Sequence, residues 1–98
     1  MLGPKSKQSN KRKSWTFLLE ASNAKEVFLT GDFNDWSQEK HPMRKDKNGT
    51  WKKRVILSPG SYEYKFLVDG QWLEDPRNNS RCPNRFGNYN SVIRLTET

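Results

Sequence analysis

The sequence predicts an all-β protein, either a β-sandwich or a small barrel, on the strength of three observations. Apolar residues alternate with polar ones along several short stretches, which is the pattern of strands with one buried face. Pairs such as Asn48-Gly49 and Asp69-Gly70 are strong signals for tight turns between those stretches. No stretch spaces its apolar residues as a helix would over three turns. About six short strands with regular turns fit a sandwich or a small barrel.

The first half of the chain is expected to hold two strands and a polar loop. Alternation begins at Ser14 and gives a strand whose buried face carries Trp15, Phe17 and Leu19. The same pattern returns with Val27 and Leu29 after a polar turn. Asp and Asn residues then crowd the segment that follows, and because their side chains bond their own backbone, that segment is expected to be a loop.

The second half is expected to hold the remaining strands. Apolar and polar residues alternate across 51–57 and again across 62–68, and a hairpin turn leads into 71–73. The segment 74–90 is rich in Asn, Arg, Pro and Gly and is expected to be a long loop. A last short strand is expected at 91–95.

The positive charge of the chain is concentrated at its N-terminus. The net charge is +7, from 18 Lys and Arg against 11 Asp and Glu, and residues 1–13 carry five of the basic residues and no acidic one. Residues 1–13 are therefore expected to be a flexible basic tail, and residues 14–98 a single module. Without the tail, 13 basic and 11 acidic residues remain, so the module itself is nearly neutral.

The residue content excludes several classes of protein. With one cysteine and one histidine, Cys82 and His41, the chain can form neither an internal disulfide nor a familiar zinc site, so no metal is expected. A chain without disulfides favours a reducing compartment, and no apolar segment of a secretory signal follows the basic N-terminus, so a cytoplasmic location is expected. No apolar run is long enough to cross a bilayer, and no membrane association is expected.

Nothing in the sequence predicts catalysis. His41 lies beside Pro42 in a polar stretch that contains no recognisable nucleophile motif. Glycosidases use two carboxylates, but the adjacent acids Glu74 and Asp75 lie in a turn-rich segment, where such residues are usually turn formers. A glycine-rich phosphate loop is also missing. The chain is therefore expected not to be an enzyme and to need no cofactor.

The four tryptophans divide into two pairs. Trp15 and Trp51 are in phase with the buried residues of their strands and are expected in the core. Trp36 falls in the Asp- and Asn-rich loop and Trp72 follows a two-residue turn, so neither fits a core. A flat indole on a rigid sheet can stack on the apolar face of a glucose ring, while Lys65 is available for the hydroxyls. The alternative is that Trp36 and Trp72 close the two ends of a thin sandwich.

Several motifs occur together in a characteristic order. They are V-F-L-T-G-D-F-N-D-W at 27–36, Pro59-Gly60, Y-K-F-L-V-D-G-Q-W at 64–72, Asp75-Pro76 and N-Y-N-S-V at 88–92. With them, residues 14–95 resemble carbohydrate-binding module family 48. That family includes the glycogen-binding module of the β subunit of AMP-activated protein kinase and the isoamylase-type early-set domain. In length and layout the chain resembles a free-standing early-set protein, without the catalytic barrel of branching and debranching enzymes.

The resemblance implies a fold and a binding site. The fold would be an immunoglobulin-like (early set) β-sandwich. Trp36 and Trp72 would stack on successive glucose rings of an α-1,4-linked glucan, and Lys65 and Asn90 would bond the 2- and 3-hydroxyls. Phe86 would be the apolar residue that threads the curve of the glucan. The family usually has Leu at this position, so Phe86 could change how deeply the glucan is threaded.

Three functions follow as hypotheses. The first is non-catalytic binding of glycogen, starch-like α-glucan or maltooligosaccharide by a monomer. The second is a protein-interaction module that docks an α-glucan enzyme or kinase and binds little sugar itself. The third, nucleic-acid binding through the basic tail and surface aromatics, is disfavoured because the body of the protein shows no basic stripe, so no specific nucleic acid is expected as a partner.

Overall fold

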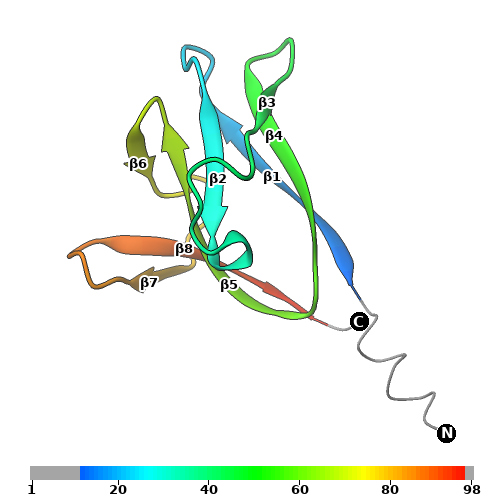
Figure 1. Ribbon diagram of the computed structural model, residues 1–98, viewed down its shortest axis with the longest axis vertical. Coiled ribbons are helices and arrows are strands. Elements are labelled where there is room, and N and C mark those ends of the chain that lie inside the picture. Colours follow the sequence, from blue (N-terminus) through cyan, green and yellow to red (C-terminus); the bar gives the residue numbers. More distant parts are fainter. Residues whose placement is uncertain (1–11, 97–98) are drawn as a thin grey trace, which may run out of the picture.

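The computed structural model describes residues 12–96, and these form an all-β structure (Figure 1). The described chain contains eight strands, all paired antiparallel, and one turn of 3₁₀ helix. The elements are β1 (Lys13–Glu20), β2 (Val27–Gly31), η1 (Asp32–Asn34), β3 (Arg44–Lys45), β4 (Thr50–Leu57), β5 (Gly60–Val68), β6 (Gln71–Leu73), β7 (Arg81–Pro83) and β8 (Tyr89–Leu95).

The strands form two sheets that pack as a sandwich. One sheet has the order β1-β4-β3, and the other has the order β2-β5-β8-β7, with β6 also paired to β5 (Figure 1). The central strand of the larger sheet, β5, pairs with β2 along one edge, and with β8 and then β6 along the other. These two antiparallel sheets confirm the predicted β-sandwich.

The core lies between the sheets and is built from the alternating apolar residues of both. The rings of Phe17 in β1 and Tyr64 in β5 meet edge to face, with centroids 4.9 Å apart. Such a contact joins the two sheets directly and adds to the burial of both rings. The larger buried side chains of the core are Phe17, Leu19, Val27, Leu29, Met43, Trp51, Val55, Leu57, Tyr64, Phe66, Ile93 and Leu95.

One of the two core tryptophans was predicted wrongly. Trp51 is buried as expected, but Trp15 keeps 39% of its surface exposed. Trp15 does lie on the same face of β1 as Phe17, opposite Val55 of β4. Alternation thus predicted the face correctly. Burial also requires a facing sheet that extends over the residue, and strand alternation does not report how far that sheet reaches.

The segment 74–90, predicted as a long loop, contains a strand that the sequence pattern missed. Residues 81–83 form β7, and β8 begins at Tyr89 rather than at residue 91. β7 is an edge strand with no apolar alternation, and it includes Pro83, which a strand tolerates at an edge. Backbone pairing with β8 holds it in place. The two-residue strand β3 at 44–45 was not predicted either.

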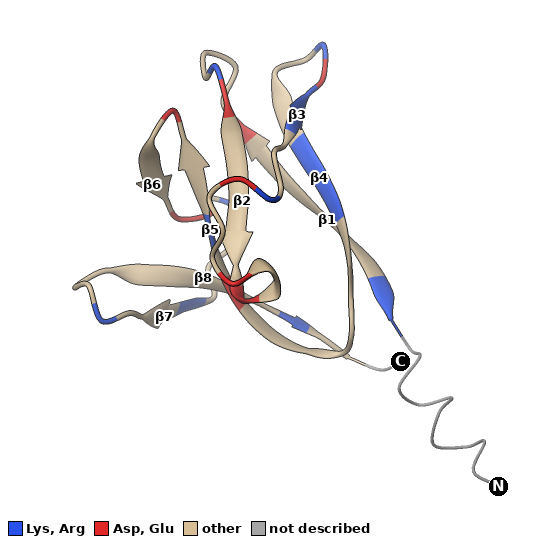
Figure 2. Ribbon diagram, in the orientation of Figure 1, with Lys and Arg blue, Asp and Glu red and all other residues tan. Residues whose placement is uncertain are grey.

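Lys and Arg occur on strands of both sheets, whereas Asp and Glu lie mostly in the turns between strands (Figure 2). The predicted tail lies outside the described residues except for Arg12 and Lys13, and Lys13 is the first residue of β1. Residues 12–96 contain no helix long and apolar enough to span a membrane. Within the same range, no three His, Cys, Asp or Glu side chains come together in a way that could hold a metal ion.

Candidate functional site

The outer face of the larger sheet presents two rows of side chains in register. Leu67 of β5 lies opposite Phe28 of β2 on one side and Trp72 of β6 on the other, which makes an apolar row. Two residues earlier on β5, Lys65 lies opposite Thr30 of β2. Residues two apart on a strand point to the same face, so both rows are on the face turned away from the core.

A hollow of about 740 Å³ opens on this face, a size typical of small-molecule sites. The side chains around it come from the loop after β2, from β5 and β6, and from the β7–β8 hairpin. All five residues that the resemblance predicts for glucan contact line this first hollow. Its lining consists of Trp36, Gln38, Glu63, Lys65, Trp72, Asn84, Arg85, Phe86, Asn88 and Asn90.

Trp36 reaches the first hollow through an unusual backbone conformation. Asp35 and Trp36 both have left-handed φ angles, 56° and 58°, which bulky non-glycine residues rarely adopt. The Trp36 amide donates a 2.9 Å hydrogen bond to the Gly31 carbonyl, and its indole Nε1 donates to Oδ1 of Asp32 at 3.1 Å. Strained conformations of this kind cluster at functional sites, where surrounding bonds hold them in place.

Asn34, a buried residue, anchors the loop that carries Trp36. Its Oδ1 accepts hydrogen bonds from the amides of Gly31 and Ser37, at 3.1 and 3.2 Å. Its Nδ2 donates to the Leu29 carbonyl at 3.0 Å and to Nδ1 of His41 at 2.7 Å. Because the amide nitrogen can only donate, His41 must accept at Nδ1 and is therefore neutral.

The surroundings of His41 favour this neutral form. Burial lowers its pKa below the usual 6.5, and the positive charges of Lys53 and Lys40 lower it further. A neutral His41 keeps Asn34 in place, and Asn34 in turn fixes the turn that presents Trp36.

The β5–β6 hairpin carries Trp72. Hydrogen bonds between its turn and the backbone of residues 25 and 26 hold the hairpin in place. The hairpin residues Asp69 and Gly70 both have positive φ angles, 48° and 84°, as expected for a two-residue hairpin loop. The Asp69 carboxylate accepts hydrogen bonds from the amides of Lys25 (2.9 Å) and Glu26 (2.8 Å). With the hairpin held in this way, Trp72 remains 46% exposed beside the first hollow.

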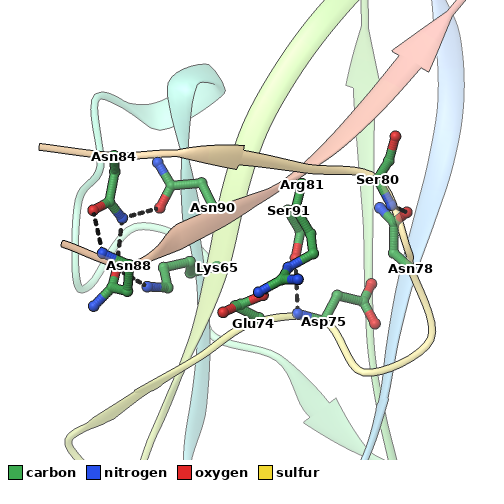
Figure 3. A network of polar contacts seen from close by, with 10 residues as sticks. All are labelled: Lys65, Glu74, Asp75, Asn78, Ser80, Arg81, Asn84, Asn88, Asn90 and Ser91. Carbon is green, nitrogen blue, oxygen red and sulfur yellow. Dashed lines mark hydrogen bonds and ion pairs between the residues drawn. The ribbon is translucent and has the colours of Figure 1, made fainter. Parts of the chain in front are cut away.

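A chain of side-chain hydrogen bonds forms the polar wall of the first hollow (Figure 3). Nζ of Lys65 donates to Oδ1 of Asn88 at 2.9 Å, and Nδ2 of Asn84 donates to the same oxygen at 2.7 Å. Asn84 also donates to Oδ1 of Asn90 at 2.9 Å. Nδ2 of Asn90 then donates to Oε1 of Glu63 at 3.0 Å. The side chains that face the hollow are therefore mutually oriented.

Phe86 lies at the tip of the β7–β8 hairpin and is 79% exposed. Oδ1 of Asn84 accepts from the amides of Phe86 (2.9 Å) and Asn88 (3.3 Å), which shapes the tip. The Arg85 guanidinium lies 5.7 Å from the centre of the Phe86 ring. These hydrogen bonds fix the backbone of the tip. The exposed Phe86 ring therefore stays beside the first hollow although it does not pack against the core.

The acidic pair in the segment before β7 has a structural role. Oδ2 of Asp75 accepts a 2.6 Å hydrogen bond from the Tyr64 hydroxyl, and the Asp75 amide donates to Oγ of Ser91 at 2.8 Å. Nδ2 of Asn78 donates to the same Tyr64 hydroxyl and to the Val92 carbonyl. Glu74 accepts from Arg81 at 2.8 Å. These bonds fasten residues 74–80 to β5, β7 and β8, and Figure 3 shows the one from Asp75 to Ser91.

The sequence interpretation gave no role to several residues of the site. Asn84, Asn88 and Glu63 make the polar wall, and Asn34 holds the tryptophan loop. Period-2 spacing was the available signal for two of them, since Glu63 is two residues from Lys65, and Asn88 is two from Asn90. For Asn84 and Asn34 the local sequence contains only turn signals.

The chain is similar to known proteins over most of its length. Residues 15–98 match the family model described as the glycogen recognition site of AMP-activated protein kinase. The 5'-AMP-activated protein kinase subunit beta-1 of Rattus norvegicus is 38% identical over 74 residues, which cover 76% of this chain and 26% of that protein. Protein PTST homolog 2, chloroplastic, of Arabidopsis thaliana is 49% identical over 55 residues, covering 56% of this chain and 10% of that protein.

A third relative is also much longer than this chain. Protein FLOURY ENDOSPERM 6, chloroplastic, of Oryza sativa subsp. japonica is 40% identical over 60 residues, which are 61% of this chain and 11% of that protein. The chain thus spans between a tenth and about a quarter of the length of these three relatives. The family model, by contrast, covers most of the chain. The chain belongs to the family of glycogen recognition modules typified by AMP-activated protein kinase.

Proposed function

We propose that the first hollow binds one chain of α-1,4-linked glucan, such as glycogen or a maltooligosaccharide, and leaves it chemically unchanged. The observation that carries the proposal is the convergence on one hollow of two tryptophans, a lysine, an asparagine and an exposed phenylalanine. Within the chain these residues lie far apart, from Trp36 to Asn90. Their convergence favours sugar binding over the hypothesis of a module that only docks a protein.

The two tryptophans suit the apolar faces of glucose. A pyranose ring presents C–H groups on its faces and hydroxyls at its rim, so a flat aromatic ring can cover a face while polar groups reach the rim. Hydrogen bonds hold the loop that carries Trp36, and a separate set holds the hairpin that carries Trp72. Both rings are therefore oriented before the ligand arrives. Preorganisation reduces the entropy lost on binding. Phe86 would provide a third apolar contact at the hairpin tip.

The polar wall retains free donors for hydroxyl groups. The Lys65 ammonium has three donors and gives one to Asn88. The Asn90 amide gives one of its two N–H groups to Glu63. The remaining donors can bond the 2- and 3-hydroxyls of a stacked glucose, with the bonds inside the wall fixing their directions.

The composition of the first hollow favours binding without hydrolysis. Glycosidases place two carboxyl groups on either side of the scissile bond. Glu63 is the one carboxylate among the described residues that line the first hollow, and its Oε1 is engaged by Asn90. We therefore infer a binding role and no glycosidase chemistry.

Titration with maltoheptaose tests this proposal, with indole N–H signals and tryptophan fluorescence as readouts. We expect the indole signals of Trp36 and Trp72 to shift and those of Trp51 to stay, because Trp51 is buried in the core. Cellohexaose, a β-1,4-linked and straighter chain, is the matched control ligand and should bind much more weakly. Unchanged Trp36 and Trp72 signals at millimolar maltoheptaose would overturn the proposal.

The variant Trp36→Ala tests whether this side chain contacts the sugar, provided that the variant still folds. Trp36→Ala should reduce maltoheptaose affinity at least about thirtyfold, since aromatic anchors of this kind contribute about 2 kcal/mol or more. If instead the variant folds and binds maltoheptaose as well as the parent protein does, the tryptophan site is wrong. Capture of an α-glucan enzyme or kinase that survives both Trp36→Ala and excess maltodextrin would support the docking hypothesis instead.

A further inference from the structure

A second hollow adjoins the first on the same face of the larger sheet. It has a volume of about 330 Å³, and the two hollows share one lining residue, Gln38. Phe28 and Leu67 form its floor, and both belong to the apolar row that runs from Phe28 across Leu67 to Trp72. The lining of the second hollow consists of Glu26, Phe28, Gln38, Glu39, Leu67 and Gly70.

The polar side chains of the second hollow have no partners within the protein. Among residues 12–96, no hydrogen bond or ion pair engages the side-chain polar atoms of Glu26, Gln38 or Glu39. The polar wall of the first hollow is different, because there Lys65 and the asparagines bond one another. The second hollow therefore combines an apolar floor with three exposed polar side chains at its rims that make no bond within the described part of the protein.

Both rims of the second hollow are held by bonds to the backbone. On one side, the Asp69 carboxylate accepts from the Glu26 amide, and the Glu26 carbonyl accepts from the Asp69 amide at 3.0 Å. On the other, Oγ of Ser37 accepts from the amides of Glu39 and Lys40, at 3.2 and 3.1 Å. The acceptors are thus carried on a fixed backbone, as a binding surface requires.

We propose that the second hollow holds the continuation of the glucan chain that leaves the first hollow past Gln38, so that the protein binds long linear α-glucans through a two-part groove. This inference rests on the proposed function. Phe28 and Leu67 would contact the C–H face of a further glucose, and the carboxylates of Glu26 and Glu39 would accept hydrogen bonds from its hydroxyls. A carboxylate on each rim favours a neutral polyol over an anionic ligand, since a further negative charge there would be repelled.

Backbone amide signals test the path of the chain without any substitution. Gly70 lines the second hollow and not the first. We expect maltotriose to shift the Trp36 and Trp72 indole signals alone, and maltoheptaose to shift the Gly70 amide as well. A Gly70 amide that maltoheptaose leaves unmoved, while the indole signals shift, would overturn the second hollow and leave the proposed function intact.

A double variant tests the contribution to affinity. Glu26→Ala with Glu39→Ala should weaken maltoheptaose binding about tenfold, as expected for the loss of charge-assisted hydrogen bonds, and leave maltotriose binding unchanged. Glu20→Ala on β1, an exposed carboxylate outside both hollows, is the matched control. Equal weakening of both sugars, or of neither, would overturn the inference. Failure of the parent protein to bind either sugar would count against the proposed function itself.

Discussion

Nζ of Lys65 lies 2.9 Å from Oδ1 of Asn88 and so connects the central strand β5 to the hairpin that carries Phe86. Lys65 is almost fully buried, with 7% of its surface exposed, although it lines the first hollow. The aliphatic stem of a lysine can pack against neighbours while the ammonium reaches a polar edge. The contact therefore places a positive donor inside the site and orients the hairpin tip at the same time.

Asn84→Ala tests whether the hairpin tip must be fixed. The change removes the side chain that bonds both Asn88 and Asn90 and that accepts from the Phe86 amide. We expect maltoheptaose affinity to fall about tenfold, equivalent to about 1.4 kcal/mol, with faster backbone motion at residues 85–87 measured by NMR relaxation. Unchanged relaxation together with unchanged affinity would show that the tip needs no such support.

The two exposed tryptophans offer a matched pair of variants. Trp72 and Trp15 have similar exposures, 46% and 39%, but only Trp72 lines the first hollow. Trp72→Ala should reduce glucan affinity about thirtyfold or more, whereas Trp15→Ala should leave it unchanged. Isothermal titration calorimetry with maltoheptaose measures both. Equal losses in the two variants would mean that tryptophan exposure alone, rather than position in the first hollow, governs binding.

Stability should decrease in mild acid because of His41. Burial and the charges of Lys53 and Lys40 lower its pKa in the folded state, so between that value and about 6.5 the unfolded chain binds more protons. The stabilisation is therefore fully present above pH 6.5 and is lost as the pH falls through the folded pKa. Urea unfolding between pH 5 and 8 measures the effect. His41→Gln should flatten this part of the pH profile, and an unchanged profile would contradict the assignment.

Tyr64→Phe tests the junction beneath the site. The Tyr64 hydroxyl donates to Asp75 and accepts from Asn78, so its removal should reduce the free energy of unfolding by about 1–2 kcal/mol. Burial raises the pKa of Tyr64, and the bond to Asp75 raises it further, so its stabilising effect is present below about pH 10 and lost as the pH rises toward the folded pKa. Urea unfolding from pH 8 to 11 should show the alkaline loss in the parent protein and a smaller one in the variant.

Local patterns predicted the strands and turns that depend on neighbouring residues. The alternation in β4 and β5 and the Asp69-Gly70 turn are found as expected, because face and turn type follow from the sequence within a few residues. β7 was missed because its pairing is with backbone groups of β8 and leaves no apolar pattern. The exposure of Trp15 was missed because it depends on how far the opposite sheet extends.

In the candidate site, too, some residues could be predicted from local sequence and others could not. Lys65 and Trp72 could be placed on an outer face or a strand end from spacing, and the family resemblance added Phe86 and Asn90. The supporting bonds of Asn34 and Asn84 could not be predicted in this way. The cited bonds of Asn34 and Asn84 reach residues five to seven positions away, and these partners come close only once each loop has folded.

By itself, the sequence determined that this protein is aromatic-rich, β-structured and nearly neutral beyond residue 13, and it predicted the faces of the main strands and a family resemblance. Those properties are set by composition and short-range periodicity. Only the tertiary structure decided that Trp36 and Trp72 share one hollow and that a second hollow adjoins it at Gln38. The physical reason is the pairing of β2 and β6 on opposite edges of β5, which brings Phe28, Leu67 and Trp72 into one row.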